Sequence, residues 1–591
     1  MDTSGQWRAR PLTWLDGAIG LGLGVAFVVV LMGTVNMGFV RDEGYYFHAA
    51  YDYLGWFKSM AVLFDQGDWT TSFTQAEIDR HFAYNQEHPV LTKVLFALSH
   101  WVFHEGLGWM SPSSSMRFPA TLFSGLLVTL VYLFGAEAFG RWHGLFAALA
   151  TIAMPRPFFH AHLAAFDYPI NTMWFFVTYA WWKSLQSDRW GWAAGLIFGV
   201  ALSVKHNVFF LPPIFVLHWL LIRGGEARLV VVDGRRRVQL PPIPVAFLSM
   251  ATLGPLVWYV LWPSHWFDTY NRVLWYFNFH LKHVHYFQYY FGQNLYQPPF
   301  PIEYPFVMSL VTMPPATLAA FAIGTVAMIA LWLRAEGGSP PLERLRRRFR
   351  ARFGAQERDP RATGWLLALS VFVPFAVIAH PNTPIFGGIK HWMPAMPFMA
   401  LVAAVGALAA AEALAGLLPE GARVARVAAT ASFLGLVIAP AITATAHNHP
   451  HGTAYYNELI GGARGAADRK MMRKFWGYSG RNGLPFLNRE VPPSGQVFFQ
   501  NTNHDSVAMY KRDGLLRADI RHGAMPVAHF GLIHHQMASR SLELEIWQAY
   551  ETRNPAMVAT YEGVPLLSIY PNTRRLPPIA PELIPGKEPP P

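Results

Sequence analysis

Long apolar runs separated by short basic loops make up most of the chain. The first run covers about residues 12–40, and later runs lie at about 117–138, 143–163, 166–182, 190–204, 207–222, 242–262, 305–333, 363–380, 392–417 and 426–446. Many of them reach about 18 residues, the length that a helix needs to cross a bilayer. The pattern therefore predicts a polytopic α-helical membrane protein with about 11 transmembrane helices.

The segment between the first and second runs has a different pattern. Its apolar side chains recur at helical spacing, at Tyr46, Ala49, Ala50, Tyr53, Leu54 and Phe57. This spacing gives a helix one apolar face and predicts that the helix lies along the bilayer surface. Residues 89–103 are apolar but short for a span, so we expect an interfacial or re-entrant helix there. The main outer loops are then residues 41–116 and 263–304.

Basic residues predict the orientation. Arg8 and Arg10 precede the first run, and later loops carry Arg141, Lys183 with Arg189, residues 223–237, the Arg-rich run 334–361, and Arg423 with Arg426. With about 11 spans these loops all fall on one side, which positive-inside bias makes cytoplasmic. Counting 90–103 as a span would turn the later clusters outward. We predict a multi-pass protein of a bacterial inner (plasma) membrane with a cytoplasmic N-terminus.

After residue 446 the sequence becomes mixed polar and apolar. Residues 496–500 and 565–570 have strand patterns, and residues 541–552 have a helical one. These predict a small soluble α/β domain over residues 447–576, which the number of spans places on the periplasmic side. The Pro-rich tail 577–591 is predicted to be disordered.

Composition narrows the possible chemistry. The chain has no cysteine, so disulfides and Cys-ligated metals are excluded and a metal must use His, Asp or Glu. The net charge of +11 comes mostly from Arg in the short loops, so it does not indicate nucleic-acid binding. No Gly-rich phosphate loop follows a strand, which argues against an activated nucleotide as the direct donor.

Unusual polar residues gather on the predicted outer face. They are Asp42, Glu43, His88, Lys93, Arg156, His160, His162, Asp167, Lys205, His206, His280, Lys282, His283, His285, Tyr286, Lys390 and His391. Ionisable groups at membrane depth are costly and usually functional. Carboxylates and cations gathered around one opening suit a reaction in which a carboxylate removes a proton while a negatively charged group leaves.

Each of these residues also has a simpler explanation. Asp42, Glu43 and Asp167 suit the first turns of helices, where acids complement the helix dipole. Lys205 and Lys390 could extend to the headgroups, and residues 275–296 could form an aromatic belt. His283 and His285 could bind a divalent metal ion, but their i, i+2 spacing suits a strand edge better than a helix. The sequence leaves metal dependence open.

Several motifs resemble a known family. They are Arg41-Asp42-Glu43, His88-Pro89-Val90-Leu91-Thr92-Lys93, Arg117-Phe118-Pro119, Asp167-Tyr168-Pro169, His391-Trp392-Met393-Pro394-Ala395-Met396-Pro397 and the segment 455–462. In order and spacing they resemble the GT-C glycosyltransferases of family 39, the protein O-mannosyltransferase and aminoarabinose-transferase branch. Val90 departs from the family's second Pro, and His391 stands where the family has Arg.

The resemblance implies a GT-C-like transmembrane catalytic domain over residues 1–446. It implies an inverting transferase that moves a sugar from a polyprenyl-phosphate donor to a periplasmic-side acceptor, which is a protein, a lipid or a cell-envelope glycan. Asp42 would be the general base, and Glu43 and Asp167 would orient the acceptor, the sugar or the base. Lys93, Lys205, Lys390 and His391 would stabilise the leaving phosphate.

The remaining polar residues complete the predicted substrate-binding set, namely His88, Arg156, His206, His283, His285 and Tyr286. The rival hypothesis is a transporter or flippase of a lipid-linked or anionic substrate, in which no covalent bond changes. Broken half-helices in paired positions at the bilayer centre would favour that rival. We found no internal repeat, and the polar residues lie near one face, which favours the enzyme.

Overall fold

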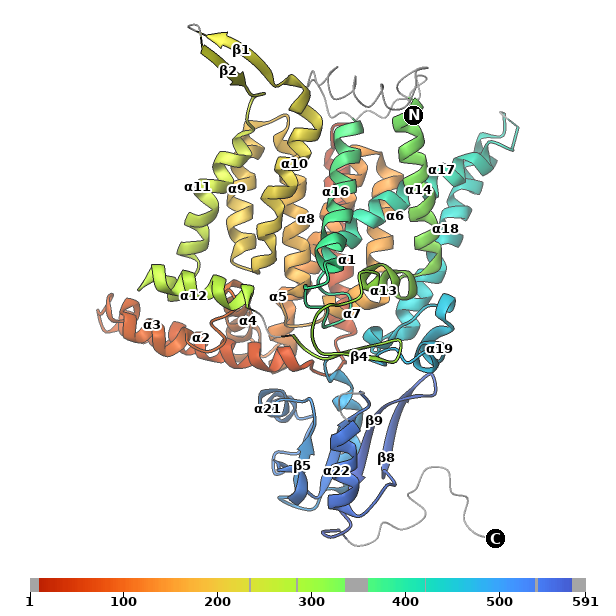
Figure 1. Ribbon diagram of the computed structural model, residues 1–591. Helices are drawn as coiled ribbons and strands as arrows, with labels where there is room; N and C mark the ends of the chain where they lie inside the picture. The colour runs from red at the N-terminus through yellow and green to blue at the C-terminus, as the bar shows by residue number, and fades with distance from the viewer. Residues whose placement is uncertain are drawn as a thin grey trace.

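The computed structural model describes residues 10–232, 235–282, 285–334, 360–419, 421–536 and 540–576. A bundle of helices makes up most of the molecule, and a smaller domain built on a sheet lies at one end of it (Figure 1). His283, most of the basic run 334–361 and the tail 577–591 lie outside the described residues. The predicted disorder of the tail and the predicted role of His283 therefore stay predictions.

The bundle contains helices that match the predicted apolar runs. They are α1 (Trp14–Gly33), α5 (Pro112–Ala138), α6 (Arg141–Ile152), α7 (Pro155–Ala161), α8 (Asp167–Ser184), α9 (Asp188–Leu202), α10 (Leu211–Arg223), α11 (Val245–Val260), α13 (Tyr304–Thr312), α14 (Pro315–Arg334), α16 (Pro360–Ala379), α17 (Met396–Ala415) and α18 (Arg423–Asn448). Within the described ranges, six helical stretches are long and apolar enough to cross a membrane. This finding supports a multi-pass membrane protein, and the count of about 11 spans stays a prediction.

Two predicted runs are each divided into two helices. Residues 143–163 form α6 and α7, and residues 305–333 form α13 and α14. Pro155 and Pro315 each begin the second helix, and Pro314 lies in the break before α14. Proline has no amide hydrogen to donate and disfavours helical backbone in the residue before it. Hydropathy does not register the loss of an amide donor at proline, so each pair of helices was predicted as one continuous run.

Close helix contacts depend on glycine. A Cβ added at Gly24 in α1 would lie 2.5 Å from the carbonyl oxygen of Gly125 in α5, and one at Gly125 would lie 2.7 Å from the carbonyl oxygen of Gly24. Beside this contact, the Thr129 hydroxyl donates a hydrogen bond to the Gly20 carbonyl at 3.0 Å. Small residues and interhelical hydrogen bonds are the usual means of holding helices together in lipid, which supplies no hydrophobic driving force between them.

Helices that lie across the end of the bundle opposite the N-terminus cover this end, which we call the site end (Figure 1). They include α2 (Arg41–Asp65), α3 (Gln75–Phe82), α4 (Leu91–Ser99) and α12 (Thr269–Leu281). The predicted apolar face of α2 is confirmed, because Tyr46, Ala49, Ala50, Tyr53 and Leu54 are buried and Phe57 is half-buried. Residues 89–103 form α4 and part of the π-helical turn η2 (His100–Gly106), and α4 lies at the site end (Figure 1).

The C-terminal domain also lies at the site end. Its five-stranded sheet has the order β6 (Arg521–His522), β5 (Gln496–Phe499), β7 (Phe530–His534), β9 (Val564–Pro571) and β8 (Met557–Tyr561). β6, β5 and β7 are parallel, while β9 pairs antiparallel with both β7 and β8. α22 (Arg540–Tyr550) packs on the sheet through Ile546 and Tyr550. The strands and the helix predicted from the sequence are thus present.

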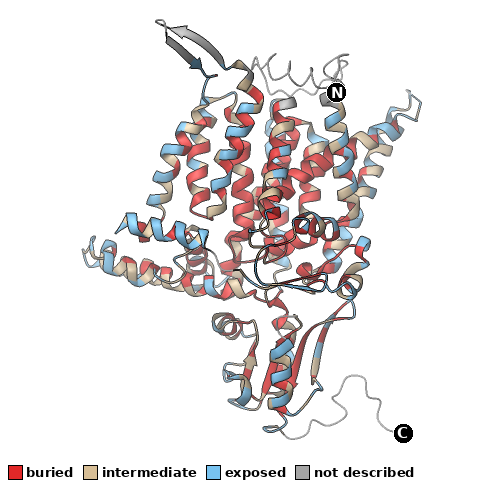
Figure 2. Cartoon of the chain, in the orientation of Figure 1, coloured by how far each residue is buried: buried red, intermediate tan, exposed pale blue. Residues whose placement is uncertain are grey.

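Burial follows the same plan (Figure 2). Buried residues fill the middle of the bundle and the sheet of the C-terminal domain, while exposed residues line the outer surfaces of α2 and α12. Specific contacts join the two parts: the Asn457 side-chain amide donates to the carbonyls of Leu310 and Met313 at 2.6 and 2.7 Å, and the Tyr510 hydroxyl accepts from the Phe39 amide at 2.8 Å. The domain therefore holds a fixed position against the bundle.

Candidate active site

Asp42 and Lys390 form an ion pair at the site end. Asp42 is the second residue of α2, and its Oδ2 lies 3.6 Å from Nζ of Lys390. The Arg41 guanidinium approaches the other carboxylate oxygen at 3.9 Å. The Asp42 side chain is 20% exposed, whereas that of Lys390 is 8% exposed. Asp42 is therefore a partly open carboxylate held between two cations, in addition to favouring the first turn of its helix.

A second acid–lysine pair lies in the same region. Nζ of Lys205 is 2.5 Å from Oδ1 of Asp167, and both side chains are largely buried. Asp167 begins α8, and Lys205 follows the end of α9. In a low-dielectric site each of these two charges stabilises the other, because an unpaired buried charge pays an uncompensated desolvation penalty. Lys390 and His160 also act on the Asp167 carboxylate electrostatically, so the two pairs share one electrostatic environment.

Helix α7 contributes His160 and Arg156. The His160 ring is buried, and its centroid lies 4.9 Å from that of Trp476 in the C-terminal domain. Arg156 donates from Nε and Nη2 to the Tyr455 carbonyl at 3.1 and 3.0 Å, and its guanidinium lies over the Tyr456 ring. Arg156 thus uses at least two of its nitrogens to hold the segment after α18, so we interpret it as a structural link beside the site rather than a substrate ligand.

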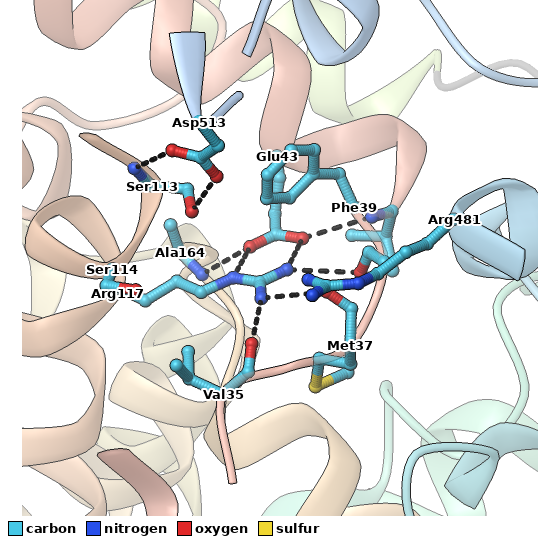
Figure 3. Close-up of polar contacts among 12 residues, drawn as sticks. Val35, Met37, Phe39, Glu43, Ser113, Ser114, Arg117, Ala164, Arg481 and Asp513 are labelled. Carbon is cyan, nitrogen blue, oxygen red and sulfur yellow. Dashed lines mark hydrogen bonds and ion pairs between the residues drawn. The ribbon is translucent and has the colours of Figure 1, made fainter. Parts of the chain in front are cut away.

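Glu43 differs sharply from its neighbour Asp42 (Figure 3). Both of its oxygens accept from Arg117, at 2.7 and 2.8 Å, and they also accept from the backbone amides of Val40 and Ala164 at 3.0 Å. Arg117 donates further to the carbonyls of Val35, Met37 and Gly38. Both side chains are buried. Glu43 therefore orients the start of α2 and with it Asp42, and it has no free oxygen for an acceptor.

Lys93 does not point into the site. Its ammonium is fully buried and donates to the Asn85 carbonyl, the Asn85 side chain and the His88 carbonyl, at 2.8, 3.2 and 3.1 Å. Burial lowers the pKa of Lys93 to about 7. An ammonium has three donors, and these three bonds use all of them. The prediction that Lys93 stabilises the leaving phosphate is therefore not supported, and Lys93 instead fixes the loop before α4.

Histidine rings gather beside the Asp167–Lys205 pair. The rings of His206 and His280 stack with their centroids 3.8 Å apart, and the His88 centroid lies 6.0 Å from that of His280. Burial and the charges of Lys93 and Lys205 lower the pKa of His88 well below its usual value. The predicted binding residues His88 and His206 thus lie together, with His280 between them.

Two more of the predicted residues, Tyr286 and His391, connect to the Asp42–Lys390 pair through aromatic contacts. Tyr286 lies under the Arg41 guanidinium at 5.6 Å and contacts Phe386, whose ring lies 4.8 Å from that of His391. His285 packs on Phe300, away from these residues' contacts. Among the described residues, no three His, Asp or Glu side chains form a group that could hold a metal ion. His283 lies outside the described residues, so a metal site formed by His283 and His285 stays a prediction.

Some residues of the site were not predicted. Arg117 belongs to a motif that carried the family resemblance, yet no role was assigned to it. Trp476 and Phe386 flank Lys390 at 4.7 and 4.9 Å. Nothing in the sequence marks one aromatic residue among so many as part of the site, and Trp476 lies in a domain to which we assigned no role.

The comparison with protein families supports the resemblance. The family model described as dolichyl-phosphate-mannose-protein mannosyltransferase matches residues 87–259. This stretch includes the motifs at 88–93, 117–119 and 167–169. The resemblance to GT-C glycosyltransferases is thereby confirmed. Asp42 and Lys390 lie outside the matched stretch, so their roles rest on the geometry described above.

Solved structures resemble the chain only at low identity. ArnT from Cupriavidus metallidurans in the apo state is 14% identical, with a TM-score of 0.48, and the match covers 95% of this chain and 99% of that one. The same protein bound to undecaprenyl phosphate is 15% identical, with a TM-score of 0.44, and the match covers 94% and 97% of the two chains. The apo oligosaccharyltransferase from Archaeoglobus fulgidus is 11% identical, with a TM-score of 0.46 and coverage of 81% and 58%. No curated protein sequence matches the chain significantly.

Proposed function

We propose that this chain is an inverting membrane glycosyltransferase that moves a sugar from a polyprenyl-phosphate donor to an acceptor at the site end. The match to a dolichyl-phosphate-mannose-protein mannosyltransferase family supports the reaction class and the type of donor. The observation that carries the proposal is the pairing of a partly open carboxylate, Asp42, with Lys390, next to the buried Asp167–Lys205 pair. Carboxylate and ammonium groups therefore lie close together at the site end.

The proposed step needs a base and a stabilised leaving group. The acceptor oxygen or nitrogen attacks the anomeric carbon of the sugar while the bond from that carbon to the phosphate oxygen breaks. The bonding electrons leave with the phosphate, and Asp42 takes the acceptor proton. Lys390 and Lys205 offset the negative charge that develops on the phosphate. Attack opposite to the leaving group inverts the anomeric configuration.

Each lysine must exchange partners for this step. In the structure Lys205 is bonded to Asp167 and Lys390 lies against Asp42. Phosphate oxygens can replace or share these carboxylates as partners, since charge-assisted bonds to phosphate are of comparable strength. A phosphate that draws Lys390 away from Asp42 would leave the carboxylate free to act as a base. Donor binding therefore prepares the base for the acceptor.

The function is tested by supplying candidate donors to the purified protein. Radiolabelled polyprenyl-phosphate sugars and a membrane extract are incubated with it, with and without a chelator, and the labelled product is identified. Transfer of label to protein, lipid or glycan identifies the acceptor, and sensitivity to the chelator decides metal dependence. Movement of the intact donor across proteoliposome membranes without any labelled product would favour the flippase hypothesis and contradict ours.

The orientation in the membrane is also a proposal. The site end carries the C-terminal domain, while the N-terminal end of α1 lies at the other end of the bundle (Figure 1). The positive-inside rule then places the site end in the periplasm. A donor whose prenyl tail lies in the bilayer can reach this mouth without a nucleotide-binding fold.

A further inference from the structure

Trp476 of the C-terminal domain contacts both sides of the candidate site. Its ring lies 4.7 Å from Nζ of Lys390, and the ring of His160 meets it edge-on, with 4.9 Å between centroids and 88° between planes. Its backbone carbonyl accepts a hydrogen bond from the Arg41 amide at 3.0 Å. Arg41 directly precedes Asp42. Trp476 therefore contacts the lysine that faces the base and also fixes the backbone next to the base.

The backbone at Trp476 is held in an unfavourable conformation. Its φ is 62°, in the left-handed region that a bulky side chain rarely occupies. Gly477 follows with φ 75°, and a Cβ there would collide with the Asn501 carbonyl oxygen. Strain of this kind persists only where surrounding contacts enforce it, and it often lies at functional sites.

A buried polar cluster anchors this strained loop. The fully buried ammonium of Lys474 contacts the hydroxyl of Ser479 and Nδ1 of His534, and the Ser479 hydroxyl lies 3.1 Å from the same His534 nitrogen. Lys474 and Ser479 flank Trp476 in sequence, and His534 ends the central strand β7. The sheet therefore sets the position of the Trp476 ring.

Lys390 is enclosed by aromatic rings from two directions. Phe386 lies 4.9 Å from its Nζ, and the segment between them closes on Trp476: a Cβ at Gly387 would lie 2.6 Å from Lys390 Cε and 2.7 Å from Trp476 Cζ2. An aromatic face attracts a cation without neutralising it. The rings can therefore hold the ammonium in place when Asp42 releases it, and its full charge stays available for a phosphate.

We propose that Trp476 is a positioning residue that acts through Lys390 in the transfer reaction. The C-terminal domain then completes the active site by supplying one wall of the aromatic enclosure. This inference rests on the proposed function. It predicts that an aromatic ring is needed at position 476, and that the need disappears when Lys390 has been removed.

A double-mutant cycle tests the proposal. W476F keeps an aromatic face, W476L keeps an apolar side chain without one, and each is combined with K390M. W476L should lower kcat about tenfold or more while the acceptor KM stays within about twofold, and W476F should recover to within about threefold of wild type. In the K390M background, W476L should change the remaining rate by less than about twofold. W547L, in a half-buried Trp of the same domain, is the matched control and should behave as wild type.

Two kinetic results would overturn the proposal. One is a W476F variant as impaired as W476L, and the other is an effect of W476L that is undiminished in the K390M background. Thermal unfolding of each variant identifies any loss that comes from misfolding, and the conservative W476F variant keeps the test valid if W476L does not fold.

A second measurement does not depend on turnover. Reductive methylation with ¹³C labels the lysines, and the Lys390 resonance is identified by its loss in K390R. The ring current of Trp476 should shift this resonance, so W476L should move it and W547L should leave it unchanged. An unmoved resonance in W476L refutes the contact and the proposal. A wild-type protein that moves no sugar would refute the proposed function instead, and the resonance tells these two failures apart.

Discussion

At the scale of single residues, neighbouring carboxylates have different tasks because their oxygens have different partners. Asp42 remains partly open and faces Lys390, whereas Glu43 is buried and fully bonded to Arg117 and two backbone amides. An acid can take a proton from an acceptor only if one of its oxygens is within reach of it. The partial exposure of Asp42 therefore suits the proposed role of base, whereas the four bonds that Glu43 accepts do not.

We therefore expect D42N to lose transfer by about 10²–10⁴-fold, the usual contribution of a general base, while thermal stability stays close to that of wild type. The measurement is the initial rate with labelled donor. D188N is the matched control, because Asp188 is exposed at the start of α9. Turnover by D42N at the wild-type rate would remove Asp42 from the mechanism.

Lys93 makes a second prediction at this scale. K93M should lower the stability of the protein by a few kcal/mol, because it leaves the two carbonyls and the Asn85 side chain without their buried donor. The folded fraction should bind the donor with nearly unchanged affinity. Thermal unfolding in detergent and donor titration separate the two effects. A large loss of donor affinity in folded K93M would restore Lys93 to the phosphate site.

At the scale of elements, the start of α2 is set by a contact far away in sequence. Arg117 in α5 ties Glu43 to the carbonyls of the chain that leads into α2, and Asn503 of the C-terminal domain donates to the Arg41 carbonyl at 2.9 Å. α2 therefore begins where three parts of the molecule meet. The geometry of Asp42 depends on all of them.

The bonds that Arg117 makes to Glu43 and to the chain before α2 form what we call the Glu43 clamp, and breaking them should lower the stability of the protein. R117M leaves the Glu43 carboxylate buried and unpaired, so we expect a loss of about 3–5 kcal/mol of unfolding free energy. R189M, at an exposed position in α9, should change stability by less than about 0.5 kcal/mol. Thermal or denaturant unfolding checks both values. Equal stability of the two variants would contradict the assigned role of Arg117.

The anchor of the Trp476 loop should make stability depend on pH. Burial and nearby Lys474 and His535 lower the pKa of His534 well below 6.5, so below about pH 6.5 the unfolded chain binds a proton that the folded chain does not. Stability then falls as the pH decreases, by up to about 1.4 kcal/mol per pH unit for one group.

H534Q removes this group and should make the fall of the unfolding temperature between about pH 6.5 and 5 less steep by the contribution of one histidine, since other buried histidines such as His88 and His535 also contribute. The neighbours Ser479 and Thr502 remain in both proteins. H504Q, at an exposed position in the same domain, serves as the control and should keep the wild-type slope. Identical slopes for H534Q and wild type would show that His534 does not contribute to the pH dependence.

At the scale of the whole molecule, the C-terminal domain forms specific hydrogen bonds with the part of the bundle that surrounds the candidate site. It holds Phe39 and Arg41 by hydrogen bonds, and its Asp513 carboxylate accepts from the Ser113 hydroxyl at 2.5 Å and from the Ser113 amide at 3.1 Å. Ser113 is the second residue of α5, the helix that carries Arg117. The domain thus supports both sides of the Glu43 clamp.

Ending the chain after Asn448 should therefore abolish transfer and lower the thermal stability of the bundle. A chain that ends at Leu576 keeps every contact named above and should match the full-length protein in both measurements. Initial rates and unfolding temperatures of the purified chains check this. A truncated bundle that transfers sugar at the full rate would show that the domain is dispensable.

The sequence predicted the elements that depend on local pattern. Apolar periodicity predicted the helices of the bundle and the buried face of α2, and alternating patterns predicted β5 and β9. The sequence missed the breaks at Pro155 and Pro314, because average hydropathy conceals a single missing amide donor. The ordered motifs indicated the family resemblance and included Asp42 and Asp167, whereas Lys205 and Lys390 were proposed from their place on the predicted outer face.

Only the tertiary structure decided which of the predicted polar residues share a site. Asp42 meets Lys390, and Asp167 meets Lys205, because the helices pack in one particular arrangement. The two residues of the second pair are 38 positions apart and those of the first pair far more, so neither pairing leaves a mark on the local sequence pattern. The same packing used Lys93, Glu43 and Arg156 for internal bonds, and it brought Trp476 in from another domain. The physical reason is that residue type fixes how many hydrogen bonds and charges a side chain offers, while the fold alone determines which groups are close enough to receive them.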